Sequence, residues 1–323
     1  MTKLVGTREV YGETLTQLGE VNQDIVVLDA DLSASTKTCL FARKFPDRFF
    51  NLGVAEQNLM GTAAGLAACG KIVFASTFAV FATGRCWEQI RYNIAYNKLN
   101  VKIVATHGGI TVGADGGSHQ CTEDIAIMRV LPEMRIIVPM DGKEMHEVIK
   151  KITEIPGPFY VRSSRVKFPL ILGDDYTFVL GKGTILREGE DVTLIGTGLM
   201  VSRCLEAAEM LAQEGISSRV INISTIKPID EDLLIDCALK TYGIVVAEEH
   251  SVIGGLGSAV AEVLSEKCPT YIYKIGVKDK FGQSGSPNDL LDYFGLNSSK
   301  IAQAAKQILA IRKRPGKVTM VAR

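Results

Sequence analysis

The sequence has no excess of charge, no long apolar run and no closely paired cysteines. Its 36 basic residues balance 36 acidic residues, so the chain lacks the overall basic field that attracts nucleic acids or anionic membranes. No run of about 18 apolar residues is present, and the segment after Met1 lacks the apolar core of a signal peptide. We therefore expect a cytoplasmic protein with no nucleic-acid and no membrane partner.

The seven cysteines are scattered and are never spaced as Cys-x-x-Cys. This spacing argues against a zinc ribbon and against a disulfide framework. We expect buried free thiols in a reducing cytosol and no metal site in this chain. The 323 residues are 46% hydrophobic and 22% charged, which suits a folded protein of about two domains.

Short apolar segments rich in Val and Ile alternate with helical patterns in the first half of the chain. Strands are expected at 24–31, 71–78, 101–107, 135–139 and 159–163, and helices at 55–69, 80–97, 122–131 and 143–155. Near-continuous apolar strands that alternate with helices indicate a parallel sheet covered on both faces.

The alternation stops between Arg165 and Asp191, where glycine-rich and aspartate-rich segments indicate a linker and turns. It restarts with strands expected at 192–196, 219–224, 243–248 and 271–277, and helices at 200–214, 230–239, 256–266 and 298–311. The sequence therefore predicts an α/β fold with two domains, 1–180 and 181–323. Each is expected to be a mostly parallel sheet with helices on both faces.

Some familiar glycine motifs are incomplete. Gly196-Thr197-Gly198 follows an expected strand, but Val201 occupies the place of the third glycine of a dinucleotide-binding fingerprint. An NAD-binding protein is thus an alternative that the missing glycine disfavours. Gly254–Gly257 could hold an anion at a helix start, although a plain turn is the simpler interpretation.

The segment Thr106–Gln120 holds two of the four histidines, His107 and His119, together with Asp115 and five glycines. It begins where an apolar strand ends, and ligands of open α/β sheets bind beyond the carboxyl ends of the strands. The glycines allow the backbone to approach a ligand closely. A flexible surface loop with solvated histidines is the alternative interpretation.

Glu56 lies at the start of an expected helix whose remainder is apolar and small. Burial there would raise the pKa of the carboxyl, so that it could donate a hydrogen bond at neutral pH. A glutamate favoured by the helix dipole is the simpler alternative. Phe78 and Phe81 follow another strand with helical spacing, and core packing would also explain them.

These clusters, in this order, resemble the transketolase family of thiamine diphosphate enzymes over essentially the whole chain. The likeness covers the pyrimidine-binding domain and the C-terminal domain of that family. The segments that carry it are Asp29–Ser35, Gly53–Gln57, Ser76–Phe81, His107–Gln120, Thr7-Arg8 and Ser164-Arg165. One departure is Gly84, which stands where the family often has an aromatic residue.

The resemblance implies a cofactor site for thiamine diphosphate. Glu56 would hydrogen-bond the aminopyrimidine ring nitrogen, and Phe78 and Phe81 would pack on the pyrimidine face. Asp31 is assigned to the same cofactor site. The bound cofactor would attack a ketose carbonyl and act as the electron sink.

The resemblance also implies a substrate site. His119 would move protons at the carbonyl and C1 hydroxyl of the donor sugar, and Asp115 would hold an acceptor hydroxyl. The sugar phosphate would be bound by Arg8, Ser35, His107 and Arg165. Glu56, His119 and His107 are the expected catalytic residues. Arg165 is chosen over the nearby Arg162 from its spacing to Pro158.

The chain lacks the Gly-Asp-Gly motif that marks the family's diphosphate- and metal-binding domain. Resemblance to the remaining domains therefore implies a split enzyme. An N-terminal transketolase subunit would bind the diphosphate and Mg²⁺ or Ca²⁺, and two copies of each subunit would assemble with paired active sites.

The expected reaction is reversible transfer of a two-carbon ketol unit from a ketose phosphate to an aldose phosphate. The alternatives are a 1-deoxyxylulose-5-phosphate synthase-like enzyme, a 2-oxo acid dehydrogenase beta-subunit-like enzyme, and a non-catalytic assembly subunit. His107 together with Arg8 and Arg165 favours a phosphorylated aldose as acceptor, and hence transketolase. The full set of Glu56, His107, Asp115 and His119 argues against a non-catalytic subunit.

Overall fold

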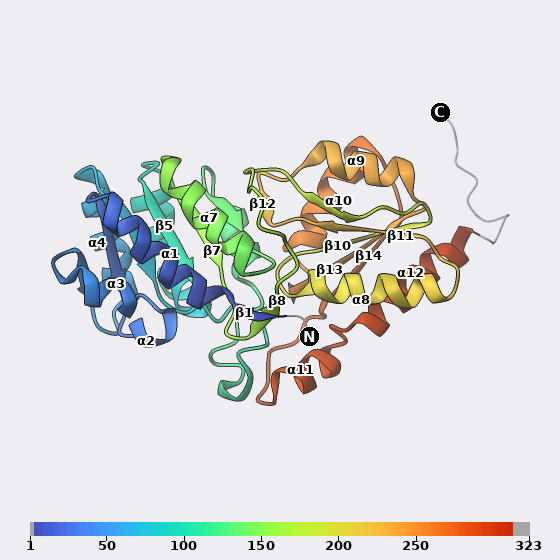
Figure 1. Cartoon of the computed structure of the whole chain (residues 1–323), viewed down its shortest axis with the longest axis horizontal. Helices are drawn as coiled ribbons and strands as arrows, with labels where there is room; N and C mark the ends of the chain where they lie inside the picture. Colours follow the sequence, from blue (N-terminus) through green and yellow to red (C-terminus); the bar gives the residue numbers. More distant parts are fainter. Residues whose placement is uncertain (1–2, 313–323) are drawn as a thin grey trace.

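Two β-sheets organise the chain, and Figure 1 shows one in each half of the molecule. The structure is a computed structural model that describes residues 3–312. A small third sheet pairs β1 (Leu4–Gly6) with β8 (Lys167–Pro169) in antiparallel fashion. This pair ties the start of the chain to the end of its first half.

The first sheet has seven strands in the order β12-β6-β7-β5-β4-β2-β3. Six of them are parallel: β2 (Ile25–Asp29), β3 (Phe49–Asn51), β4 (Ile72–Ser76), β5 (Val101–Ala105), β6 (Arg135–Ile137) and β7 (Phe159–Arg162). The seventh, β12 (Thr225–Lys227), comes from the second half of the chain and runs antiparallel to β6. The first sheet thus includes a strand from beyond residue 180. The predicted domain boundary between residues 180 and 181 therefore stays a prediction.

Helices cover both faces of the first sheet. One face carries α1 (Thr7–Val21), α3 (Cys39–Lys44) and α7 (Gly142–Glu154), whose apolar residues pack with Val27, Phe74 and their neighbours. The other face carries α4 (Glu56–Ala68), residues 81–95 and α6 (Asp124–Arg129). The short elements α2 (Ser33–Thr36), η1 (Pro46–Arg48) and η4 (Gly113–Asp115) lie in connections.

The helix predicted over 80–97 is interrupted. The π-helical turns η2 (Phe81–Arg85) and η3 (Ile90–Ala95) flank the short helix α5 (Trp87–Gln89). Cys86 leaves the helical conformation at φ −120° and ψ 24°, and its thiol donates to the Ala82 carbonyl at 2.8 Å. Side-chain bonds of this kind compete with the helical ladder, and π-helical turns are frequent at functional sites.

The second sheet has the order β14-β13-β10-β11-β9. Its strands β10 (Val192–Gly196), β11 (Ser218–Asn222), β13 (Ile244–Ser251) and β14 (Ile272–Val277) are parallel, whereas β9 (Thr184–Arg187) is an antiparallel edge strand. The helices are α8 (Met200–Gln213), α9 (Glu231–Lys240), α10 (Leu256–Lys267), α11 (Pro287–Phe294) and α12 (Ser298–Arg312). The predicted fold class, two mostly parallel sheets with helices, is confirmed.

One hydrophobic cluster spans both halves, since Leu59 and Ile103 of the first share it with Ile221 and Val246 of the second. All seven cysteines are free, and four are buried as predicted, whereas Cys69 is exposed and Cys39 and Cys268 are partly exposed. No helix among residues 3–312 is long and apolar enough to cross a membrane.

Candidate active site

Most segments with predicted site residues follow the carboxyl ends of parallel strands in the first sheet, whereas Arg8 follows β1 of the small antiparallel sheet. Asp31 follows β2, Glu56 follows β3, Phe78 follows β4 and His107 follows β5. Because these strands are parallel neighbours, their carboxyl ends meet at one edge of the sheet, where ligands of such folds bind.

Glu56 is the first residue of α4 and is only 2% exposed, so the predicted burial is confirmed. Its Oε2 accepts a hydrogen bond of 2.8 Å from Nη1 of Arg85, whose side chain is 49% exposed. The Arg85 guanidinium also lies 4.9 Å from the Phe81 ring centroid. The sequence did not predict this ion pair, although Gly84, where the family often has an aromatic residue, directly precedes Arg85.

Four rings from two segments form one cluster next to this ion pair. The Phe78 and His107 rings are stacked with centroids 3.7 Å apart, and the Phe78 and Phe81 rings are stacked at 5.9 Å. The His119 ring stands edge-on to Phe81 at 5.5 Å and to Phe78 at 6.3 Å. The structure thus brings together the predicted aromatic pair and both histidines of the glycine-rich segment.

His107 is buried and has a left-handed φ of 61°. Its Nδ1 lies 2.9 Å from the Thr106 hydroxyl. Burial, together with the positive charges of Arg8 and Arg165, lowers the pKa of His107 to about 3. The imidazole is therefore neutral at physiological pH, and any contact of His107 with a phosphate would be a hydrogen bond rather than an ion pair.

His119 is half-buried, and its Nδ1 lies 3.0 Å from the Ser118 hydroxyl. Its Nε2 has no hydrogen-bond partner among residues 3–312. That nitrogen can therefore exchange a proton with a ligand that lies within hydrogen-bond distance.

Arg8 and Arg165 line a single cavity of about 520 Å³, together with Gly113, Ala114 and the segment Gly285–Pro287. Arg165 Nη1 lies 3.6 Å from Asp115 Oδ2 and also donates to the Val112 carbonyl. Two guanidinium groups at one cavity suit a phosphate or another oxyanion. The structure thus places two predicted substrate residues, Arg8 and Arg165, at one cavity, and a third, Asp115, beside Arg165.

Ser35 reaches this group through its backbone, since its carbonyl accepts a 3.1 Å hydrogen bond from Arg8 Nη1. Arg162 is 5% exposed, and its Nε donates to Asp124 at 2.8 Å. Arg162 is therefore engaged inside the protein, whereas Arg165 is open to a ligand.

Asp31 is exposed and makes two hydrogen bonds with Asn51. The Asp31 backbone N–H donates to Asn51 Oδ1 at 2.9 Å, and Asn51 Nδ2 donates to Asp31 Oδ1 at 3.1 Å. Among residues 3–312, Asp31 makes no hydrogen bond to Glu56 and does not contact Phe78 or Phe81 through a ring interaction. The buried aspartate here is Asp29, which accepts from Thr36 and Thr38 at 2.7 and 2.9 Å. Burial raises the pKa of Asp29, and these hydrogen bonds oppose that rise.

The turn Gly196-Thr197-Gly198 packs against the first domain. Thr197 donates to the Val138 carbonyl at 3.3 Å, and a Cβ at Gly198 would lie 3.1 Å from Val138. The first domain thus occupies the space at this turn, which further disfavours a dinucleotide there.

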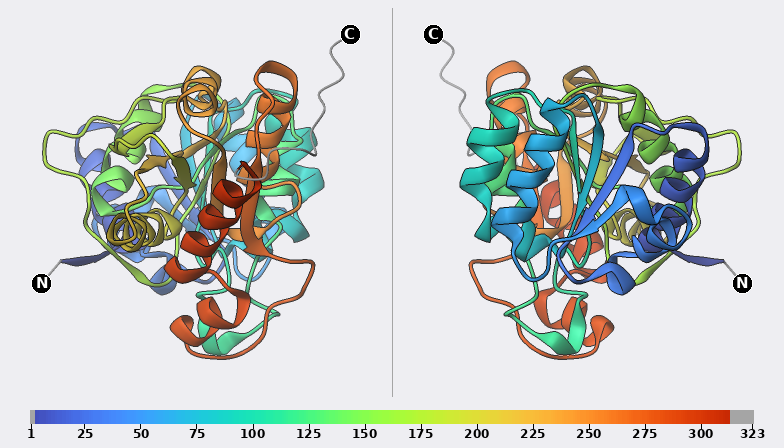
Figure 2. Two further views of the ribbon diagram at one scale, coloured as in Figure 1. Left: turned by 90° about the vertical axis from the view of Figure 1, so that its right-hand side faces the viewer. Right: turned by 90° about the vertical axis from the view of Figure 1, so that its left-hand side faces the viewer.

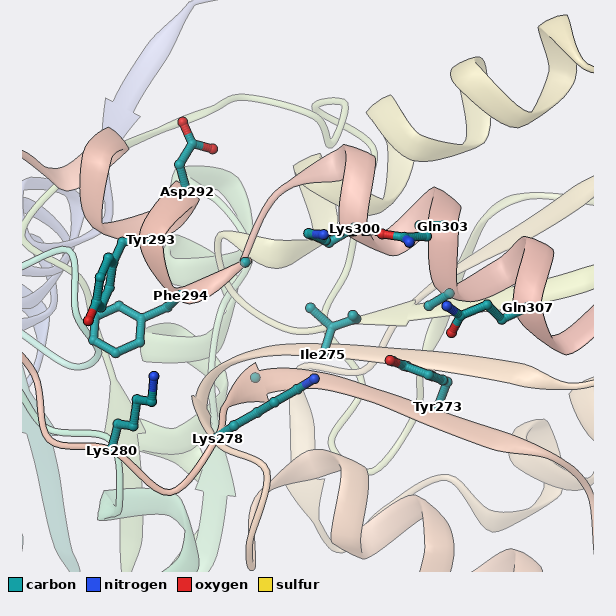
Figure 3. A pocket seen from close by; sticks show the side chains of 13 residues that line it. Tyr273, Ile275, Lys278, Lys280, Asp292, Tyr293, Phe294, Lys300, Gln303 and Gln307 are labelled. Atoms are coloured by element: carbon teal, nitrogen blue, oxygen red, sulfur yellow. Dashed lines mark hydrogen bonds between the residues drawn. The ribbon is translucent and has the colours of Figure 1, made fainter.

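Another cavity, of about 410 Å³, lies between β14 and α12 (Figure 3). Lys278, Lys280 and Lys300 line it together with Tyr273 and Tyr293. It contains none of the predicted site residues. Among residues 3–312, no group of three or more His, Cys, Asp or Glu side chains could hold a metal ion.

Comparison with known proteins identifies two family models in the chain. Residues 3–169 match "Transketolase, pyrimidine binding domain", and residues 181–301 match "Transketolase, C-terminal domain".

Relatives of known name are similar over almost the full length. A putative transketolase C-terminal section from Methanocaldococcus jannaschii is 53% identical over 92% of this chain and 94% of its own length. The 6-deoxy-6-sulfo-D-fructose transketolase subunit SqwH of a Clostridium species is 42% identical over 93% of this chain and 94% of its own length. A solved structure described as a split gene transketolase, inactive beta4 tetramer, is 53% identical, with a TM-score of 0.87 over 95% of this chain and 98% of that chain.

Proposed function

The chain belongs to the transketolase family, and from this premise we propose that it is the C-terminal subunit of a split transketolase. In this proposal it transfers a two-carbon ketol unit between sugar phosphates, and only together with an N-terminal subunit. Support comes from the Methanocaldococcus relative, which is named a C-terminal section and matches this chain along 94% of its length.

The residues present fit the aminopyrimidine of thiamine diphosphate. Arg85 holds one oxygen of the buried Glu56 carboxylate, and the other oxygen has no hydrogen-bond partner among residues 3–312. A buried carboxylate beside stacked phenyl rings suits a flat ring that carries nitrogen donors and acceptors. Glu56 would bind the ring nitrogen, and Phe78 and Phe81 would orient the ring.

When bound, the cofactor supplies a carbon nucleophile and an electron sink for the ketose carbonyl. The remaining chemistry belongs to side chains of this chain. His119 would give and take the proton of the donor hydroxyl, since its Nε2 is unpaired among the described residues. His107, which is neutral, would hydrogen-bond the substrate. Asp115 would hold an acceptor hydroxyl at the rim of the cavity lined by Arg8 and Arg165.

In the same proposal, the N-terminal subunit binds the diphosphate and Mg²⁺ or Ca²⁺. Two copies of each subunit would assemble, with each active site between unlike chains. The split gene transketolase tetramer described as inactive contains beta chains. That description supports the expectation that this chain alone is inactive.

Two arginines in one cavity favour a phosphorylated sugar over an unphosphorylated 2-oxo acid. This observation favours transketolase over the dehydrogenase alternative. The observation that carries the whole proposal is the convergence of Glu56, the ring cluster and the arginine cavity at one sheet edge, although they come from separate motifs.

Reconstitution tests the proposal. We expect the purified chain with its N-terminal subunit, thiamine diphosphate and Mg²⁺ to transfer ketol units from xylulose 5-phosphate to ribose 5-phosphate. We expect negligible transfer by the chain alone. Full activity of the single chain would contradict the split enzyme, and inactivity of the reconstituted pair with all ketose phosphate donors would contradict ketol transfer.

A further inference from the structure

The glycine-rich segment 107–120 is held from the second domain as well as the first. Figures 1 and 2 both show η4 of this segment beside α11, below the two sheets. The contacts include a hydrogen bond from the segment's backbone to Glu249 and one from its Gln120 side chain to the backbone of the second domain. They add to the apolar cluster that already joins the two halves.

Glu249, on β13, makes the first of these contacts. Its carboxylate is 4% exposed and accepts a 2.7 Å hydrogen bond from the backbone N–H of Thr111. A Cβ at Gly109 would lie 2.3 Å from the carboxyl group of Glu249, so glycine is required where the carboxylate meets the segment. The carboxylate therefore fixes the backbone midway between His107 and Asp115.

Arg162, on β7 of the first domain, also bonds to Glu249 of the second domain. Its Nη2 donates to the Glu249 carbonyl at 2.9 Å and to the Cys121 carbonyl at 3.1 Å. Burial raises the pKa of the Glu249 carboxyl, and the Arg162 guanidinium opposes that rise. The bridge is thus a buried network in which each charged group depends on its partners.

A second contact holds the other end of the segment. Gln120 Nε2 donates to the Gln283 carbonyl at 2.9 Å and to the Ile110 carbonyl at 3.0 Å. A Cβ at Gly117 would lie 2.7 Å from the Gly282 carbonyl oxygen. The backbones of the two domains therefore touch here without room for a side chain.

We propose that the second domain positions the substrate-binding segment, with Glu249 as the principal positioning residue and Gln120 as a second anchor. Asp115 lies between these two anchors and His119 directly precedes the second, so both depend on them for their placement. The expected effect on the kinetics of the enzyme rests on the proposed function. The expected effect on the placement of segment 107–120 does not.

Glu248 provides a matched control on the same strand. Its carboxylate is 1% exposed and accepts from the N–H groups of Leu256 and Gly257 at 2.7 and 2.8 Å. Glu248 thus supports α10 inside the second domain, whereas Glu249 supports the segment. Substitution of either removes an equally buried carboxylate.

Hydrogen exchange on the single chain tests the structural part without any assay of activity. In Glu249→Ala the amides of the segment, Thr111 above all, should exchange about tenfold faster than in the wild type, while Glu248→Ala leaves them unchanged. Gln120→Leu should speed amide exchange at the Gln120 end of the segment. This variant replaces Glu249→Ala as the test if Glu249→Ala does not fold. Unchanged exchange in both segment variants would overturn the proposal.

Kinetics of the reconstituted enzyme test the consequence. We expect Glu249→Ala to lower kcat/KM for the acceptor sugar about tenfold to a hundredfold, with thiamine diphosphate affinity unchanged. Glu249→Gln keeps the acceptor oxygen and should restore most of this loss. Equal kinetic losses in the Glu248 and Glu249 variants would overturn the positioning role. If the wild-type pair shows no ketol transfer, the proposed function fails, while the exchange result still decides the structural claim.

Discussion

The two domains share one architecture but use the same edge of their sheets differently. In the first domain, the carboxyl ends of β2 to β5 carry Glu56, the two phenylalanines and both histidines of the candidate site. In the second domain, the carboxyl ends of β10 and β13 contact the first domain through Thr197 and Glu249. The edge at which ligands usually bind is thus a docking edge in the second domain, which explains why its glycine turn need not bind a nucleotide.

The largest effect should follow from a change on the first domain's edge. Glu56→Ala should lower turnover of the reconstituted enzyme by at least about a hundredfold, because it removes the proposed hydrogen bond to the cofactor ring, and a positioned acid–base group contributes about this much or more. Steady-state kinetics, with circular dichroism to verify folding, would measure it. Gln57→Ala, which changes the exposed neighbour, is the control. Wild-type turnover in Glu56→Ala would refute the cofactor assignment.

Two ion pairs of equal length should contribute very differently to the free energy of unfolding. Arg162–Asp124 and Arg85–Glu56 both measure 2.8 Å, but the first is buried on both sides and Arg85 is half-exposed. Arg162→Ala should cost about 3–5 kcal/mol because it leaves the buried Asp124 carboxylate without its charged partner. Arg85→Ala should cost less, because removal of a half-exposed side chain lets water reach the Glu56 carboxylate. Urea unfolding of the single chain would compare them, and similar losses would contradict the assigned burial.

Arg165 should affect binding of substrate rather than stability. Removing a guanidinium that binds a phosphate costs about 1.5–3 kcal/mol, so Arg165→Ala should raise KM for the phosphorylated acceptor about tenfold to a hundredfold. Arg165→Lys should retain part of the affinity. A KM within twofold of wild type in the alanine variant would exclude Arg165 from the phosphate site.

The last comparison concerns the pH dependence of stability, which the buried His107 should influence. Because the pKa of folded His107 is about 3, against an ordinary value of 6.5, the unfolded chain binds the extra proton between these values. Stability due to this site is therefore fully present above pH 6.5 and is lost as the pH falls toward 3. His107→Asn should reduce the loss of stability between pH 6.5 and 4, measured by thermal unfolding. An unchanged pH profile would contradict the buried neutral imidazole.

Much of the fold follows from patterns in the sequence. The strand predicted at 192–196 matches β10, and the helix predicted at 55–69 contains α4, since apolar periodicity reports burial directly. Helix α1 was missed because its buried face includes Gly12, Thr14 and Gly19, which leave no apolar stripe. The strands β9 and β12 were missed because they are short antiparallel additions at sheet edges.

The candidate site was predictable where it lies in local motifs. Glu56, Phe78 and His107 stand in such motifs, and the structure brings them together. Arg85 and Glu249 were not identified, because their partners are 29 and 138 residues away. A buried carboxylate at the end of a strand resembles a solvated one in sequence, and only the tertiary structure distinguishes them.

A crystal structure of this chain with its N-terminal subunit and thiamine diphosphate would test the central claim most directly. We predict that the Glu56 carboxylate hydrogen-bonds the aminopyrimidine ring while Phe78 and Phe81 pack against it. A cofactor bound elsewhere, or a Glu56 carboxylate directed into solvent in that complex, would contradict the account.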